Sequence, residues 1–192
     1  VENAVRLGAR TFRHDGAWGL PKDGSARTFQ QALPRIAEGC RRVTEYAAAR
    51  GIRTMVENHG TFLQDSLRLE QLVAAVDHAN FGLLVDMGNF MCADETPVAS
   101  VAIAAPLAAH AHAKDFHFKK KGEFVPKHGW FSTRGGDSLR GAMIGHGVVN
   151  VPECLKILRS AGYDGWLSVE FEGMEDCLMA LKYNLETLRE LV

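Results

Sequence analysis

The sequence predicts an α/β protein, a TIM (β/α)8-type barrel of which about six βα units lie in these 192 residues. Short apolar runs alternate with longer segments of helical periodicity, the pattern of a parallel sheet covered on both faces. Four of the runs end in an acid or a histidine, and these residues are separated by 29, 26 and 58 positions: Glu57, Asp86, His112 and Glu170. Because a barrel spends roughly 31 residues on each βα unit, the gaps correspond to one, one and two units. We therefore expect residues 1–192 to form a single, partial barrel domain.

Six short runs are the expected strands: residues 11–13, 53–57, 82–86, 109–112, 142–144 and 167–170. A closed barrel of this class needs eight. The chain also starts at Val1 in a segment that reads as the end of a helix, so we infer that two N-terminal βα units are absent from it. Unless a partner closes the gap, the outer strands would be open edges that favour a homo-oligomer, which a clean monomer in light scattering would contradict.

Five segments between the strands are expected to be helical: residues 28–50, 66–79, 97–108, 151–161 and 176–191. The first has an N-cap in Thr28, apolar residues at spacings of three and four, and a C-terminal stop at Gly51. The segment 97–108 is the weakest, because its alanine-rich face gives little periodicity.

Composition limits the class of protein. A formal net charge of −1, a pI near 6.8 and 46% hydrophobic residues fit a globular domain with a real core. Without a basic surplus, we expect no nucleic-acid partner. The four cysteines lie far apart without a CxxC pair, so we expect reduced thiols in a cytoplasmic protein. We also expect no signal peptide and no membrane segment, since the apolar stretch 98–109 is too short to cross a bilayer.

The carboxyl ends of parallel strands meet at one mouth of a barrel, so the four strand-end residues should converge there. Three carboxylates and an imidazole are an N/O ligand set suited to one divalent ion. Glu57 and Asp86 could instead form salt bridges, but two acids ending adjacent buried strands are costly without a cation. His110 competes with His112, because residues two apart on a strand point to the same side. Glu172 competes likewise with Glu170, which is preferred because it directly ends its apolar run.

Four stretches of the chain resemble the sugar phosphate isomerase/epimerase family, the xylose-isomerase-like TIM barrels of the AP endonuclease family 2 superfamily. They are Val56-Glu-Asn-His59, Val85-Asp-Met-Gly-Asn89, His110-Ala-His-Ala-Lys-Asp115 and residues 162–173. The resemblance implies one divalent ion, Mn²⁺, Co²⁺, Mg²⁺ or Zn²⁺, held by the four strand-end residues. The His-x-Lys-Asp pattern of that family favours His112 over His110. In its ketose 3-epimerases the two glutamates move protons on opposite faces of the substrate, which assigns catalytic roles to Glu57 and Glu170.

The expected chemistry is proton transfer next to a carbonyl group. It needs a positioned base and a charge that stabilises the developing enediolate oxygen, which a divalent ion can supply. With two glutamates in place, we expect an isomerase or epimerase acting on a small ketose, keto-sugar or polyol. One base and a leaving group would instead give a lyase or dehydratase acting on a 3-keto-sugar or inosose, and a non-catalytic binding subunit is the alternative outside enzymes. Endonuclease IV, which shares this barrel, needs more histidines at the strand ends than the sequence offers.

Five residues are candidates for binding a small sugar substrate: His59, Asn89, Lys114, Trp130 and Arg134. Many family members have histidine where this chain has Asn89, and an amide can hydrogen-bond a hydroxyl but carries no proton at neutral pH. His59 either contacts substrate or is satisfied by the backbone. Trp130 and Arg134 lie in the glycine-rich stretch 119–147, which we expect to be a lid or substrate loop.

Lys114 is open to two interpretations: an ion pair with Asp115, or an ammonium group that reaches a substrate oxygen. His14 and Trp18, after the first expected strand, are weaker candidates for the same pocket.

Overall fold

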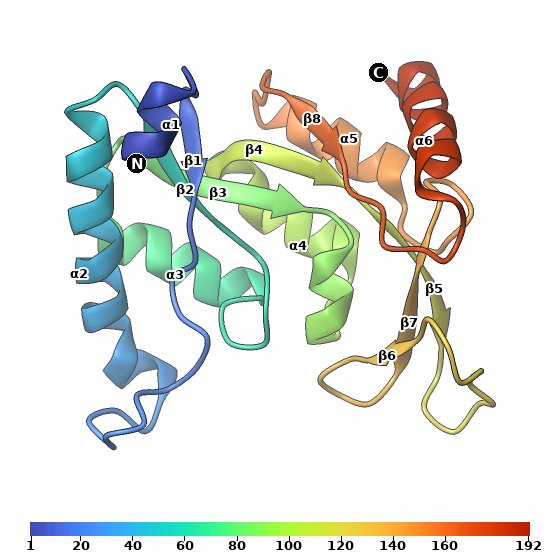
Figure 1. The fold of residues 1–192 in the computed structure, drawn as a ribbon. Coiled ribbons are helices and arrows are strands. Elements are labelled where there is room, and N and C mark those ends of the chain that lie inside the picture. Colours follow the sequence, from blue (N-terminus) through green and yellow to red (C-terminus); the bar gives the residue numbers. More distant parts are fainter.

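The computed structural model describes residues 1–192 and contains two sheets (Figure 1). The larger sheet is parallel and has the order β1-β2-β3-β4-β8. Its strands are β1 (Thr11–Arg13), β2 (Arg53–Glu57), β3 (Phe81–Asp86), β4 (Ala108–Ala113) and β8 (Leu167–Val169). The smaller sheet is antiparallel, in the order β5-β7-β6, and consists of β5 (Asp115–Lys119), β6 (Phe131–Ser132) and β7 (Ser138–Ala142). The larger sheet and its helices form the partial barrel that the sequence predicts.

The helices follow the parallel sheet along its outer side, and α2 and α3, α3 and α4, and α4 and α5 pack against one another (Figure 1). They are α1 (Glu2–Arg6), α2 (Phe29–Ala48), α3 (Ser66–Val76), α4 (Pro97–Ala104), α5 (Val151–Ser160) and α6 (Cys177–Leu191), with 3₁₀ turns η1 (Asn89–Ala93) and η2 (Ala105–Leu107). All five predicted helices are confirmed, although the last turn expected for α4 is the separate turn η2. None of the helices combines the length and hydropathy that a membrane span requires.

Local sequence explains where these helices begin. The side chains of Thr28, Asp65, Asn150 and Asp176 each accept a hydrogen bond from a backbone N–H three residues later, at the starts of α2, α3, α5 and α6. Such N-caps satisfy donors that the first turn leaves free. The predicted stop of α2 at Gly51 is also confirmed, because this residue takes a φ of 72°, which favours glycine.

The parallel strands point alternate side chains to opposite faces. In β3, Leu83 and Val85 join the hydrophobic core of 25 residues beneath the helices, whereas Leu84 and Asp86 do not. All six residues of β3 are buried, as expected for a strand covered on both faces. The same alternation places Glu57 and His112 on the face away from the helices.

One predicted strand is wrong. Residues 142–144 do not form a sixth parallel strand; β7 ends at Ala142 and pairs antiparallel with β5, while β4 pairs directly with β8. The reason is that the chain leaves the parallel sheet at Lys114 and turns back on itself. The carboxylate of Asp115 accepts hydrogen bonds from four backbone N–H groups, those of Phe116, Gly145, Gly147 and Val149. The parallel sheet therefore has five strands, against eight in a closed barrel.

Candidate metal centre and adjoining pocket

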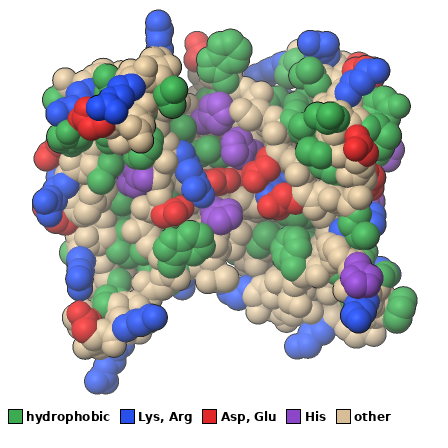
Figure 2. All heavy atoms as spheres, in the orientation of Figure 1, with side chains coloured by type: hydrophobic (Ala, Val, Ile, Leu, Met, Phe, Trp, Pro, Cys, Tyr) green, Lys and Arg blue, Asp and Glu red, His purple; other side chains and the backbone are tan.

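Four side chains converge at the carboxyl ends of the parallel strands. Each offers one ligand atom, and these atoms all lie within 4.8 Å of one another: Glu57, Asp86, His112 and Glu170. They come from β2, β3, β4 and the residue after β8, so strand ends bring together the four residues that the sequence indicates. In the space-filling view, acidic and histidine side chains gather in the hollow at the centre of this face (Figure 2). We call these four residues, the candidate ligands of a single ion, the metal cluster.

A single ring nitrogen faces all three carboxylates. Nδ1 of His112 lies 2.9 Å from Oε2 of Glu170, 3.5 Å from Oδ2 of Asp86 and 3.6 Å from Oε1 of Glu57. Burial lowers the pKa of His112, but the three surrounding carboxylates outweigh it and raise that pKa to about 11. A protonated Nδ1 therefore donates a hydrogen bond to Glu170 and places its positive charge near the other two carboxylates, where a cation would have the same neighbours.

The three carboxylates differ in their pKa. Burial raises the pKa of Asp86 to about 6. The hydrogen bond with His112 holds the pKa of Glu170 well below its usual range. Burial acts to raise the pKa of Glu57, but His112 and Arg13 together lower it. Both glutamates are thus ionised at neutral pH.

Asp86 provides the test of whether a cation fits. Its Oδ1 accepts hydrogen bonds from the N–H groups of Gly88, at 2.9 Å, and Asn89, at 2.7 Å. Its Oδ2 is buried and has no hydrogen-bond partner, and the residue is fully buried. An unsatisfied buried oxygen costs about 1–3 kcal/mol. Ligation of a cation would satisfy this oxygen, and a set of three carboxylates and one imidazole is suited to a divalent ion.

Asn58 ties the strand ends that carry two of the ligands. Its side-chain amide donates to the carbonyl oxygen of Asp86 and accepts from the Asp86 N–H, both at 2.8 Å, and Asn58 is fully buried. These two bonds extend the contact between β2 and β3 beyond the last paired residues. They fix Glu57 and Asp86 relative to each other.

Replacing Asn58 with alanine is expected to lower the free energy of unfolding by about 2–4 kcal/mol, because two buried hydrogen bonds are lost and two backbone groups of Asp86 stay unsatisfied. Urea unfolding of the two proteins measures the difference. The exposed Asn3 offers the control Asn3→Ala, which should change stability little. A loss below about 1 kcal/mol for Asn58→Ala would show that these bonds contribute nothing beyond ordinary contacts.

Arg13 is a contact that the sequence did not indicate. Its Nη2 lies 2.9 Å from Oε2 of Glu57 and 3.2 Å from Oδ1 of Asp15. Arg13 is the last residue of β1, as Glu57 is of β2 and Asp86 is of β3. Its place at a strand end is the only sequence feature that could have indicated this contact, and an arginine there does not by itself indicate a metal site.

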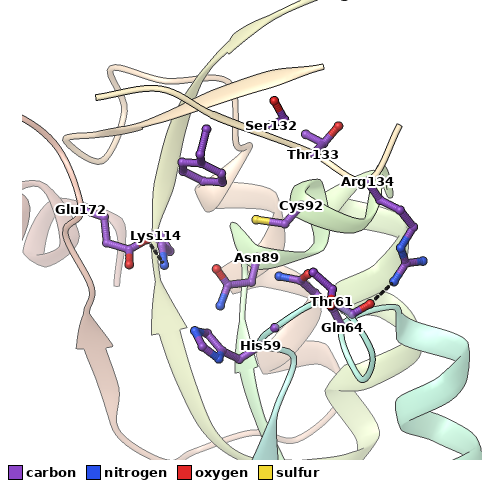
Figure 3. A pocket seen from close by; sticks show the side chains of 12 residues that line it. His59, Thr61, Gln64, Asn89, Cys92, Lys114, Ser132, Thr133, Arg134 and Glu172 are labelled. Carbon is purple, nitrogen blue, oxygen red and sulfur yellow. Dashed lines mark hydrogen bonds and ion pairs between the residues drawn. The ribbon is translucent and has the colours of Figure 1, made fainter. Parts of the chain in front are cut away.

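A cavity of about 410 Å³ adjoins the metal cluster (Figure 3). It is lined by His59, Gly60, Thr61, Gln64, Asn89, Cys92, Lys114, Phe131, Ser132, Thr133, Arg134 and Glu172. Asn89 donates to Oε1 of Glu57 at 3.4 Å, and Nζ of Lys114 lies 3.5 Å from Oε1 of Glu170. These two residues connect the cavity to the metal cluster.

Four of the five candidate substrate-binding residues line this cavity: His59, Asn89, Lys114 and Arg134. Trp130 does not; the side chains of Lys119 and Arg140 stack on its ring, and its neighbour Phe131 lines the cavity instead. The stretch 119–147 is not an open loop, because most of the smaller sheet lies within it.

Lys114 contacts neither Asp115 nor solvent. It is 2% exposed, and its Nζ lies 2.6 Å from Oε2 of Glu172, a pair seen on the cavity wall opposite Arg134 (Figure 3). Burial opposes its charge, but the nearby carboxylates of Asp86, Glu170 and Glu172 raise its pKa. Lys114 is therefore a buried cation between the metal cluster and the cavity.

The remaining candidates lie apart from the metal cluster. His110 contacts Oγ of Ser168 at 2.8 Å. Trp18 packs edge-on against the ring of His59 and is 65% exposed, while the ring of His14 contacts the carbonyl of Asp15. Geometry therefore selects His112 over His110, and Glu170 over Glu172, for the metal cluster.

Arg134 links the tip of the smaller sheet to the loop after β2. It donates to the carbonyl of Thr61 at 2.9 Å and lies 3.2 Å from Oδ2 of Asp65. The turn after β6 is thus held across the rim of the cavity.

The family model for the xylose isomerase-like TIM barrel matches residues 1–191 of the chain. Inosose dehydratase of Bacillus thuringiensis (strain Al Hakam) is 27% identical over 148 residues, which are 72% of this chain and 46% of that protein. The chain thus spans about half the length of the curated relatives it matches.

Two solved structures share the fold. The IolI protein with a bound zinc atom superposes with a TM-score of 0.75 at 16% identity, over 100% of this chain and 66% of that one. The 3-keto-D-glucoside 4-epimerase YcjR of E. coli, in its apo form, gives a TM-score of 0.66 at 18% identity, over 98% of this chain and 67% of that one. At these identities the similarity establishes the fold.

Proposed function

Because the chain belongs to the xylose isomerase-like TIM barrel family, we propose that it acts in a divalent-metal-dependent sugar isomerase or epimerase. The substrate class is a small ketose, keto-sugar or polyol, converted by proton transfer through an enediolate. One observation carries the proposal: four ligand atoms lie within 4.8 Å of one another, and one of them is a buried oxygen without a partner. The proposed ion is Mn²⁺, Co²⁺, Mg²⁺ or Zn²⁺, the set that the family resemblance implies, because carboxylates suit Mg²⁺ and Mn²⁺ and imidazole suits Zn²⁺.

Glu57 and Glu170 approach the centre from different sides, since β3 and β4 lie between β2 and β8 in the sheet. Both are ionised at neutral pH, as a general base must be before it accepts a proton from a substrate carbon. The bound ion would supply the positive charge that stabilises the enediolate oxygen. Return of a proton on the opposite face needs a donor that has taken up a proton, and the charged Lys114, 3.5 Å from Glu170, stabilises that glutamate in its ionised form.

The cavity suits a polyhydroxylated ligand. Only Cys92 and Phe131 among its twelve lining residues are hydrophobic. His59, Asn89 and Arg134 place hydrogen-bonding groups along its walls, and polar groups that converge in a pocket fix the orientation of a ligand. The proposed partner is thus a small sugar, in a chain that we propose to work as a homo-oligomer.

A metal-dependent dehydratase acting on an inosose or 3-keto-sugar is the second candidate. The similarity to inosose dehydratases over 72% of the chain favours it specifically. Both reactions begin with removal of a proton next to a carbonyl group. They differ in the second step, because the dehydratase expels a hydroxyl group where the epimerase restores the proton.

The first experiment measures metal in the purified chain by inductively coupled plasma mass spectrometry. We expect about one divalent ion per chain, consistent with a single cluster, and its loss in Glu57→Gln and His112→Ala. The matched controls Glu172→Gln and His110→Ala replace the two competing residues outside the metal cluster and should retain the ion. Absence of metal from the wild type after reloading would contradict the proposal and leave a non-catalytic binding subunit.

The loaded protein is then offered keto-sugars and inososes in deuterated water. Deuterium incorporated into an otherwise unchanged carbon skeleton supports the isomerase or epimerase. Loss of water from the substrate supports the dehydratase.

A further inference from the structure

Each carboxylate of the metal cluster has one oxygen that faces the centre. These inner oxygens are the ones closest to Nδ1 of His112: Oε1 of Glu57, Oδ2 of Asp86 and Oε2 of Glu170. The other oxygen of every carboxylate faces outward. The arrangement thus offers three single oxygens and one nitrogen to a cation.

Every outer oxygen already has a donor. Backbone N–H groups hold that of Asp86, and Nζ of Lys114 approaches that of Glu170 at 3.5 Å. For Glu57 the donor is Arg13, at 2.9 Å from Oε2. Of the two side-chain donors, Arg13 makes the shorter contact.

The contact between Arg13 and Glu57 has the features of a positioning interaction. The side chain of Glu57 is 6% exposed, so its outer oxygen has little access to water. The Arg13 side chain is 34% exposed, reaches in from the edge strand β1, and is also held by Asp15 at 3.2 Å. Arg13 thus ties Glu57 to a second strand.

We propose that Arg13 is a positioning residue that fixes Glu57 as a one-oxygen ligand, and that this makes the metal cluster prefer a small six-coordinate ion such as Mn²⁺ to Ca²⁺. The proposal rests on the metal site of the proposed function. A carboxylate can bind one ion through both oxygens only if neither is held elsewhere. Ca²⁺ takes 6–8 oxygen ligands, often from two-oxygen carboxylates, whereas smaller ions accept fewer ligands in stricter geometry.

If Arg13 acted through its charge alone, its removal would change Mn²⁺ affinity in the opposite direction. Arg13 is positive, so removing it reduces repulsion and should strengthen the binding of all divalent ions about equally. A positioning role predicts weaker Mn²⁺ binding together with unchanged or stronger Ca²⁺ binding. The ratio of the two affinities separates these roles.

The test is calorimetric titration of the whole chain with Mn²⁺ and, separately, with Ca²⁺. In Arg13→Met the Mn²⁺ to Ca²⁺ preference should fall at least about tenfold, the lower end of the range typical for contacts behind a ligand. Arg13→Lys should recover part of it, because an ammonium can hold one oxygen without the planar fork. Arg35→Met is the control, since Arg35 is 74% exposed and pairs only with the exposed Asp23.

An unchanged preference in Arg13→Met, or equal changes for both ions, would overturn the proposal. A wild type that binds neither ion would instead contradict the metal site of the proposed function. Infrared spectra of the Mn²⁺-loaded wild type give a second measurement that does not depend on a variant folding. The separation of the two carboxylate stretching bands is large for one-oxygen ligands, as expected here, and a small separation, typical of two-oxygen ligands, would also overturn the proposal.

Discussion

Replacing Asp86 with asparagine is expected to abolish tight metal binding and, at the same time, to stabilise the metal-free protein. Asparagine keeps the acceptor oxygen that holds the N–H groups of Gly88 and Asn89. The atom it changes is Oδ2, which is buried without a hydrogen-bond partner. The substitution therefore removes a buried charge while leaving the turn after β3 in place.

The two effects have different sizes. Loss of a direct ligand should weaken metal binding by more than the roughly 10–100-fold typical of residues behind a ligand. The gain in the free energy of unfolding should be about 1 kcal/mol or more, because an unsatisfied buried oxygen costs about 1–3 kcal/mol. Metal titration and urea unfolding measure them separately.

The pH dependence of the stability gain follows from the pKa of Asp86. Burial raises that pKa from 3.8 to about 6, so the folded protein binds this proton more tightly than the unfolded chain. The stability that Asp86 contributes is therefore largest below pH 3.8 and is lost as the pH rises through about 6. Asp86→Asn should accordingly stabilise the protein at pH 7, and the gain should shrink toward pH 4.

Asp115 is the matched control, a second aspartate that is 1% exposed. Its two oxygens accept four backbone N–H groups. Asp115→Asn replaces one acceptor with a donor, so it should destabilise the protein by about 2–4 kcal/mol while the metal cluster keeps its ligands. Retention of tight metal binding in Asp86→Asn would show that Asp86 is not a ligand.

Strand ends were predictable because their signal is local. A short apolar run that stops at an acid or histidine identifies both the strand and the residue at its carboxyl end, as at Glu57 and Asp86. Alternation then puts these side chains on the same face. It cannot decide between residues two positions apart, which is why only the family resemblance favours His112 over His110 in the sequence.

The predictions that failed concern structure that depends on contacts between distant segments. The pairing of β5 with β7 rests on Asp115, whose carboxylate contacts backbone groups up to 34 residues away. Nothing local distinguishes that aspartate from the partner of a neighbouring lysine. Because the antiparallel sheet lies between β4 and β8 in the sequence, the 58 positions between His112 and Glu170 do not represent two barrel units.

The orientation of the short strand β6 toward the cavity could not be predicted from the sequence for a similar reason. β6 has only two residues, so the sequence gives too short a pattern to determine which side faces the cavity. Trp130 does not line the cavity, whereas its neighbour Phe131 does, and a role of Trp130 in substrate binding stays a prediction. Arg13 gave no signal because an arginine at a strand end is typical of an ordinary surface.

Metal binding is expected to release a proton from His112 and to strengthen about tenfold per pH unit between about pH 6 and pH 9. Nδ1 of His112 is the ring nitrogen that faces the three carboxylates. Burial lowers its pKa, but these carboxylates raise it from 6.5 to about 11, so the metal-free protein keeps this proton at neutral pH. A cation can ligate Nδ1 only after the proton leaves.

The dependence of metal affinity on pH should become steeper below about pH 6. Asp86, with a pKa of about 6, also binds a proton below that pH, so the number of protons released should rise from one toward two. The contribution of His112 to the stability of the metal-free protein should instead fall as the pH rises. Because its folded pKa exceeds the usual 6.5, the stabilisation that His112 provides is complete below pH 6.5 and is lost as the pH rises toward about 11.

Calorimetric titrations with Mn²⁺ in two buffers of different ionisation enthalpy give the number of protons released at each pH. His110→Ala is the control, because His110 lies outside the metal cluster, and burial and the neighbouring positive His112 lower its pKa. The control should therefore release as many protons as the wild type. A binding affinity that stays flat from pH 6 to pH 9, with no proton released, would mean that the central position of the metal-free cluster is not held by a proton on His112. The three carboxylates would then repel one another across at most 4.8 Å, and the neighbouring cations Arg13 and Lys114 would have to balance their charge.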